Sequence, residues 1–170
     1  MPPILVAVDN LFAAIFIFLV VWAMVSDASR LIIPNWVSVG LVASYFTYAL
    51  AVQNESPIFL HLIVAGIVFL IGLAFFVRKW VGGGDVKFLA AVALWAGPGL
   101  ILPLLMIMSV TGIALALIVL FARMHFGEMA ADAGPRGAAR LVPRWVRLGL
   151  CPYGIAIGLA SLLTVPGRFF

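Results

Sequence analysis

The number of helices that this chain can pass through a membrane depends on residues 86–122, VKFLAAVALWAGPGLILPLLMIMSVTGIALALIVLFA. A helix needs roughly 20 apolar residues to cross the hydrocarbon layer of a bilayer, so this stretch fits one long span or two short ones. The sequence Gly97-Pro98-Gly99 interrupts the stretch, and Pro103 lies just beyond it. Apolarity alone does not separate the two arrangements, but the distribution of charge does.

Basic residues collect in the cytoplasmic loops of membrane proteins. With two spans in residues 86–122, the loops that carry the basic residues all lie on one side, and only Arg168 lies opposite. With one span, the most basic loop would lie outside, against this rule. The sequence therefore predicts two spans here, six in total, with both termini on the extracytoplasmic side.

The composition agrees with a polytopic membrane protein. The chain is 66% hydrophobic and 9% charged, whereas a soluble domain is about half apolar and about a quarter charged. So many apolar side chains in 170 residues must face lipid. We expect an all-α fold, a single membrane-embedded domain over residues 1–170, and the bilayer as a partner. The high pI then reflects basic cytoplasmic loops, and it does not indicate nucleic acid.

The other spans are bounded by polar or turn-forming residues. We expect them over residues 4–25, 34–52, 58–77 and 152–165. Residues 123–148 form the only long polar loop that the sequence predicts. Within this loop, residues 140–147 alternate arginine with apolar residues, which is typical of a segment on an anionic membrane surface, although a plain cytoplasmic loop explains the same pattern.

Two aspartates lie at the predicted cytoplasmic edge. Asp27 follows the first span and Asp85 precedes the fourth. Two carboxylates that share a site can activate a water molecule and protonate a carbonyl oxygen, and they titrate as a pair. There are simpler interpretations: Asp27 could form an ion pair with Arg30, and Asp85 could be the N-cap of the fourth span.

The glycines at residues 82–84 allow two functional interpretations. A phosphate-binding loop is weakly supported, because the Lys-Ser/Thr that normally follows it is missing. Alternatively, the glycines let an extended peptide approach the backbone. Lys87 could contact lipid headgroups or adjust the field of the site. One cysteine and two histidines provide no disulfide and no metal cluster, so we expect no metal and no cofactor.

Three motifs together resemble a known family. Residues 82–87, GGGDVK, resemble the GxGD signature of intramembrane aspartyl proteases in the GxGDxK form of type IV prepilin peptidases. Residues 27–35, DASRLIIPN, resemble the second catalytic segment of that family, and residues 152–156, PYGIA, resemble its Pro-Tyr-Gly stretch. Each motif alone is modest, but the three in this order are specific.

The resemblance implies a membrane endopeptidase that removes the short basic leader of prepilins or pseudopilins at the cytoplasmic face of the cytoplasmic membrane. It implies that Asp27 and Asp85 are the catalytic pair. Prepilins are then the substrates, and membrane components of pilus assembly are possible further partners. The residues expected to shape the site or to bind substrate are Arg30, Pro34, Asn35, Gly82, Gly83, Gly84, Lys87 and Tyr153.

Larger members of this family carry an N-terminal domain with paired cysteines that is tied to methylation of the new pilin terminus. Here the first span starts at once and there are no cysteine pairs. The chain resembles the short form of Flp-type (tight-adherence) pili, which predicts proteolysis without methylation. Two alternatives are a small proton-coupled transporter and a non-catalytic assembly subunit. The transporter predicts inverted repeats and midplane charges, and we find neither.

Overall fold

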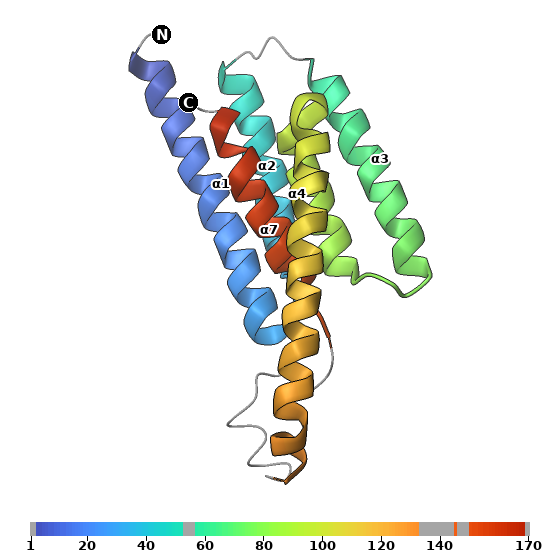
Figure 1. Ribbon diagram of the computed structural model, residues 1–170. Helices are drawn as coiled ribbons and strands as arrows, with labels where there is room; N and C mark the ends of the chain where they lie inside the picture. The colour runs from blue at the N-terminus through green and yellow to red at the C-terminus, as the bar shows by residue number, and fades with distance from the viewer. Residues whose placement is uncertain (1–2, 53–56, 133–144, 146–149, 169–170) are drawn as a thin grey trace.

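The computed structural model describes residues 3–52, 57–132, 145 and 150–168. In this part of the chain all regular elements are helical (Figure 1). The elements are α1 (Pro3–Arg30), α2 (Asn35–Val52), α3 (Ile58–Val77), α4 (Gly83–Asp132), α7 (Tyr153–Thr164) and the short 3-10 helix η1 (Pro166–Arg168).

Four of these helices have segments that are long and apolar enough to cross a membrane. The segments are Ile4–Arg30, Asn35–Val52, Ile58–Val77 and Gly83–His125, and α7 is a shorter apolar helix. Much of their surface consists of exposed large apolar side chains, such as those of Phe59, Leu70 and Val110. Such a surface requires lipid around it. The prediction of an all-helical membrane protein is therefore confirmed.

Helix α4 reverses direction within its length. Gly97 has φ 60° and ψ −170°, which interrupts the helix, and Pro98 follows at once. Figure 1 shows the first part of α4 running up the bundle and the second part running back down beside it. A Cβ at Gly97 would collide with the ring of His61 from α3. The same ring forms a 2.8 Å hydrogen bond through Nδ1 with the carbonyl of Leu94. Glycine is required at this position because both the backbone angle and the space exclude a side chain.

The core holds α1, α2 and the first part of α4 together. Phe16 and Trp95 are completely or almost completely buried, and their rings pack 5.4 Å apart. The indole N–H of Trp95 donates a 2.9 Å hydrogen bond to the carbonyl of Leu41 on α2. A buried indole needs such a partner. Helix α7 packs between α1 and α4, and α3 packs on α4. This packing fixes the end of α1 relative to the start of α4.

The predicted element boundaries were correct where a polar turn bounds an apolar run. The third span was predicted over residues 58–77, where α3 lies. The first span was predicted to end at Val25, but α1 continues to Arg30. Ser29 lies in this extension, and its hydroxyl donates a 2.7 Å hydrogen bond to the carbonyl of Val25. Asp27 therefore lies in the last turn of α1 and does not follow it.

The predicted loop at residues 123–148 was wrong over its first part. Helix α4 continues to Asp132, since the stretch around Glu128 is rich in good helix formers such as alanine, methionine and glutamate. The predicted membrane-surface segment at residues 140–147 lies outside the described residues except for Trp145.

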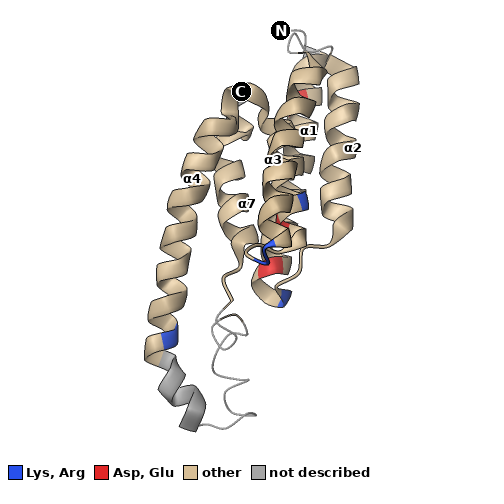
Figure 2. Cartoon of the chain, turned by 90° about the vertical axis from the view of Figure 1, so that its right-hand side faces the viewer, with Lys and Arg blue, Asp and Glu red and all other residues tan. Residues whose placement is uncertain are grey.

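The charges of the described residues are asymmetric along the bundle. Figure 2 shows the lysines and arginines that it colours away from the start of α1. They are Arg30, Arg78, Lys79, Lys87 and Arg123, which come from the end of α1, the turn after α3 and α4, whereas Arg168, the other basic residue of the described chain, lies in η1. The asymmetry that the sequence predicts is therefore present in three dimensions.

Candidate active site

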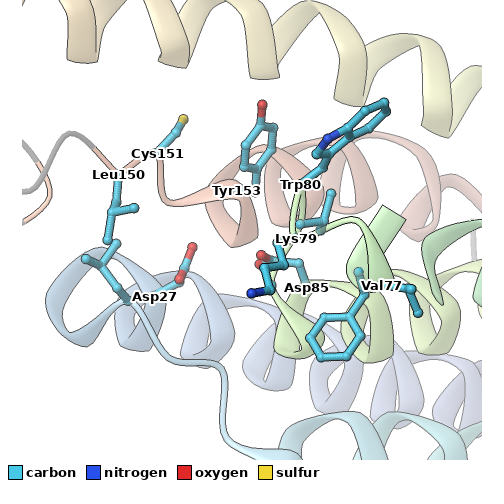
Figure 3. Close-up of a pocket in the computed structure, with 12 residues that line it drawn as sticks. Asp27, Val77, Lys79, Trp80, Asp85, Leu150, Cys151 and Tyr153 are labelled. Atoms are coloured by element: carbon cyan, nitrogen blue, oxygen red, sulfur yellow. The ribbon is translucent and has the colours of Figure 1, made fainter. Parts of the chain in front are cut away.

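Helix ends bring the two aspartates together. Asp27 lies in the last turn of α1 with only 5% of its surface exposed, and Asp85 lies in the first turn of α4. Figure 3 shows both side chains at the same pocket, reached from two different helices. Residues far apart in the sequence thus supply two carboxylates to one space, as the sequence analysis predicted.

Two cavities flank this pair. The first has a volume of about 790 Å³, and both aspartates line it. Its other lining residues are Leu31, Phe76, Val77, Lys79, Trp80, Val81, Gly82, Leu150, Cys151 and Tyr153. The second has a volume of about 420 Å³ and is also lined by both aspartates. The remaining residues around the second cavity are Leu31, Ile32, Ile33, Pro34, Asn35, Gly82, Gly83 and Gly84. An extended peptide that passes the carboxylates has space on both sides.

The first turn of α7 holds Asp27 in position. The backbone N–H of Gly154 donates a 2.8 Å hydrogen bond to Oδ2 of Asp27. The first N–H groups of a helix have no partner within the helix, so a carboxylate is a suitable acceptor there. A Cβ on residue 154 would lie 2.8 Å from that same oxygen and 2.9 Å from Cδ1 of Ile33. Glycine thus allows the close approach that the hydrogen bond requires.

Two residues with left-handed backbone conformation direct their side chains toward the first cavity. Leu31 has φ 56° and follows α1, and Lys79 has φ 60° and follows α3. After α3, the N–H of Lys79 bonds the carbonyl of Phe76 at 2.8 Å, and the N–H of Trp80 bonds that of Phe75 at 3.0 Å. This is the Schellman arrangement, in which glycine is the usual left-handed residue. Both helix ends therefore hold unfavourable backbone angles beside the aspartates.

The glycine segment differs from the prediction. Gly83 and Gly84 lie in the first turn of α4, so only Gly82 lies outside the helix, and a strand-like edge over residues 82–84 was wrong. The N-cap interpretation of Asp85 was also wrong, because Asp85 is itself in the first helical turn. The backbone of Gly82 forms a hydrogen bond with the Asp85 carboxylate, and a Cβ on residue 82 would lie 2.9 Å from Oδ2 of Asp85. The glycine sequence thus brings the chain close to the carboxylate.

The other predicted residues divide into two groups. Pro34, Asn35 and Tyr153 line cavities that contain an aspartate. Lys87 lines neither of these two cavities, but its Nζ donates a 3.1 Å hydrogen bond to Oδ1 of Asn35, which lines the second cavity. Arg30 is exposed at the end of α1 and lines neither cavity. The structure therefore does not bring Arg30 to either cavity.

The sequence analysis missed most of the first cavity's walls. The left-handed conformation of Leu31 and Lys79 could not be predicted from their residue types, because this conformation is unusual for both leucine and lysine. Cys151 was considered only as a residue that can form neither a disulfide nor a metal cluster, yet it lines the cavity together with Tyr153. Its position immediately before the Pro-Tyr-Gly stretch was the one available signal.

Comparison with known proteins supports an assignment. Residues 14–117 match the type IV leader peptidase family, and this region includes both Asp27 and Asp85. The chain belongs to that family. It is therefore an aspartic-type hydrolase of prepilin leaders. Comparison of this leader peptidase with curated proteins and with solved structures found no match.

The candidate site contains two carboxylates and one thiol. Within the described residues, no group of three or more histidine, cysteine, aspartate or glutamate side chains is placed to hold a metal ion. Burial raises the pKa of the Cys151 thiol, and the negative charges of Asp27 and Asp85 raise it further. Cys151 is thus held in its neutral form beside the pair, which is the opposite of what a thiol nucleophile needs.

Proposed function

We propose that Asp27 and Asp85 are the catalytic pair of this leader peptidase. The observation that carries the proposal is that both carboxylates line the same two cavities, although they come from α1 and α4. Membership of the family identifies the reaction as cleavage of the peptide bond that joins a prepilin to its leader.

In the proposed mechanism the pair shares the proton transfers. The ionised carboxylate removes a proton from water as that water attacks the scissile carbonyl carbon. The protonated carboxylate donates its proton to the carbonyl oxygen, and the amine later leaves with a proton from the pair. Because two coupled carboxylates titrate as a unit, we assign these roles to the pair and not to single residues.

We infer an orientation with the site at the cytoplasmic face. The concentration of Arg78, Lys79 and Lys87 near the aspartates supports it through the positive-inside rule. The reversal of α4 at Gly97 supports six membrane segments, with α4 contributing two and α7 one. Both termini are then extracytoplasmic. Reporter fusions at the C-terminus test this orientation: a periplasmic reporter should be active there and a cytoplasmic one inactive.

We further propose that the substrates belong to Flp-type pili and that the protein does not methylate them. The support is that the given sequence contains a single cysteine, so it holds no cysteine pair of the kind tied to methylation in larger family members. Incubation of purified protein, cleaved pilin and S-adenosylmethionine should leave the mass of the pilin unchanged. A mass gain of one methyl group would refute this part.

The central experiment is cleavage in vitro. Wild type, Asp27→Asn and Asp85→Asn are reconstituted in liposomes, mixed with a Flp-type prepilin and followed by mass spectrometry. We expect loss of the leader with wild type only, while both variants insert and accumulate normally. Near-normal turnover by either variant would remove that aspartate from the mechanism. A wild type that is folded but inactive would favour a non-catalytic role in pilus assembly.

A further inference from the structure

The segment between α1 and α2, residues 31–34, is held against the start of α4. Ile33 packs there, because a Cβ on Gly84 would lie 3.4 Å from Cβ of Ile33 and 3.5 Å from its carbonyl oxygen. On the side of α1, the hydroxyl of Ser26 donates a 2.7 Å hydrogen bond to the carbonyl of Ile32. The segment is thus fixed at both sides and forms one wall of the smaller cavity of the two carboxylates.

Asn35 follows this segment as the first residue of α2, and Lys87 orients its side chain. Nζ of Lys87 lies 3.1 Å from Oδ1 of Asn35. An ammonium group only donates hydrogen bonds, so it must contact the oxygen of the amide and not the nitrogen. The N–H2 group of Asn35 is therefore the branch of the amide that Lys87 leaves unoccupied.

This N–H2 group has two donors that the described part of the chain does not use. Among residues 3–52, 57–132, 145 and 150–168, the structure shows no hydrogen bond of the Asn35 side chain besides that with Lys87. Asn35 is exposed, and it lines the smaller cavity together with Asp27 and Asp85. A molecule in that cavity can therefore reach the side chain and accept a hydrogen bond from it.

The other walls of the cavity favour a peptide as this molecule. They consist of the two carboxylates, the segment 31–34 and the glycines 82–84, which leave the main chain uncovered. An ionised carboxylate repels the phosphate of a lipid headgroup, and a lipid acyl chain has no acceptor for an N–H. A peptide backbone carries no net charge and offers a carbonyl oxygen at every residue.

We propose that the amide of Asn35 donates a hydrogen bond to a backbone carbonyl of the prepilin next to the cleaved bond, and that Lys87 is the positioning residue that orients this amide. The inference rests on the proposed function, because it takes the cavity of Asp27 and Asp85 as the place of cleavage. Asn35 then contacts the substrate, whereas Lys87 acts through Asn35.

The first test separates donation to the substrate from the contact with Lys87. Asn35→Asp keeps an oxygen for Lys87, and a negative charge is favourable at the N-terminus of α2, so the thermal unfolding midpoint should not fall. The substitution removes both N–H donors, so kcat/KM for prepilin cleavage should fall roughly three- to tenfold, and Asn35→Ala should lower it as far. If the amide only held α2 against α4, Asn35→Asp would keep the wild-type kcat/KM, and the proposal would be overturned.

The charge that Asn35→Asp adds has its own control. A charge effect on the catalytic pair alone would move the pH at which the rate is highest and leave that highest rate unchanged. Loss of a donor should instead lower the rate over the whole pH profile, in Asn35→Ala as well as in Asn35→Asp. Asn10→Ala is the matched control, because Asn10 is exposed on α1 and lines neither cavity of the pair. Recovery of the full rate by Asn35→Asp at a shifted pH would refute the donor role.

The second test asks whether Lys87 acts through Asn35. Lys87→Met should lower kcat/KM in the wild-type background, but it should cause no further loss in Asn35→Ala, because the amide that it orients is gone. Arg123→Met is the control for loss of a positive charge from α4, since Arg123 is exposed and lines neither cavity of the pair. Additive effects of Lys87→Met and Asn35→Ala would remove Lys87 from this role.

A third measurement does not depend on cleavage. Binding of a fluorescent prepilin to the Asp85→Asn variant in liposomes is titrated with and without Asn35→Ala, and Asn10→Ala again serves as the control. Asn35→Ala should raise Kd roughly three- to tenfold, and an unchanged Kd would overturn the proposal. If wild type cut no prepilin while Kd still depended on Asn35, the proposed function would fail and the contact of Asn35 with the substrate would stand.

Discussion

The backbone N–H of Gly154 lies 2.8 Å from Oδ2 of Asp27 and donates a hydrogen bond to it. This bond connects the first turn of α7 to the last turn of α1. It gives α7 a role in orienting the carboxylate.

Gly154→Ala should therefore impair catalysis without removing any functional group. The added Cβ would lie 2.8 Å from Oδ2 of Asp27, so the carboxylate must move. A displacement of this kind can reduce turnover about 100-fold. The measurement is kcat for prepilin cleavage in liposomes. Gly112→Ala is the control, because its Cβ would have only ordinary contacts at 3.9 Å with Tyr153 and Ala156. Full activity of Gly154→Ala would mean that the carboxylate does not need this position.

Lys79→Gly should stabilise the protein. Lys79 has φ 60°, which is unfavourable by about 1–2 kcal/mol for a residue with a Cβ. Glycine adopts this angle freely, so the thermal unfolding midpoint should rise. Lys79→Ala keeps the Cβ and serves as the control for loss of the ammonium group. If the two variants unfold at the same temperature, the left-handed conformation is not a source of strain.

Cys151 should react slowly with alkylating reagents. The thiolate is the reactive form, and burial and the two aspartates raise the pKa of this thiol. At neutral pH less thiolate is present than in an ordinary cysteine, and the alkylation rate should continue to rise at higher pH. At a pH where both carboxylates are ionised, Asp85→Asn removes one negative charge, lowers the pKa of Cys151 and should accelerate alkylation several-fold. Because the chain has one cysteine, mass spectrometry reads the rate directly. If Asp85→Asn and wild type are alkylated at the same rate, the charge of Asp85 does not affect the pKa of Cys151.

Gly97→Ala should destabilise the fold by at least about 2 kcal/mol, because it combines a left-handed angle with a collision. The collision is with the ring of His61. The measurement is the amount of protein that accumulates in the membrane and its unfolding midpoint. Gly99→Ala, two residues later, meets no atom within 4 Å and should be neutral or slightly stabilising. Normal accumulation of Gly97→Ala would show that the reversal of α4 tolerates a side chain.

Apolarity and charge predicted the helices well because lipid imposes strong constraints on both. The bounds of α3 follow from an apolar run between a polar turn and Arg78-Lys79. The end of α1 was missed because polarity marks the edge of the apolar run and not the end of the helix. At that end Ser29 bonds Val25 and the hydroxyl of Ser26 bonds the carbonyl of Ile32 at 2.7 Å, so polar residues belong to the helix and its turn.

The pairing of Asp27 with Asp85 could be predicted because Asp27 ends one apolar run and Asp85 begins another. The hydrogen bond between Gly154 and Asp27 could not be predicted, because almost every residue type has a backbone N–H. The same holds for Ser38, whose buried Oγ without a hydrogen-bond partner is seen only in the folded structure. Contacts of this kind depend on how helices from distant parts of the chain approach one another.

The hydrogen bond from Gly154 also has a consequence for biosynthesis. During translation both aspartates leave the ribosome well before α7 does, because α7 begins only at Tyr153. A nascent chain that has inserted α1 and α4 thus contains both carboxylates but lacks the N–H of Gly154, which bonds the carboxylate of Asp27. Proteolytic competence should arrive late, with the last helix. A partly synthesised protein would then be unable to cut the nascent membrane proteins that share its insertion machinery.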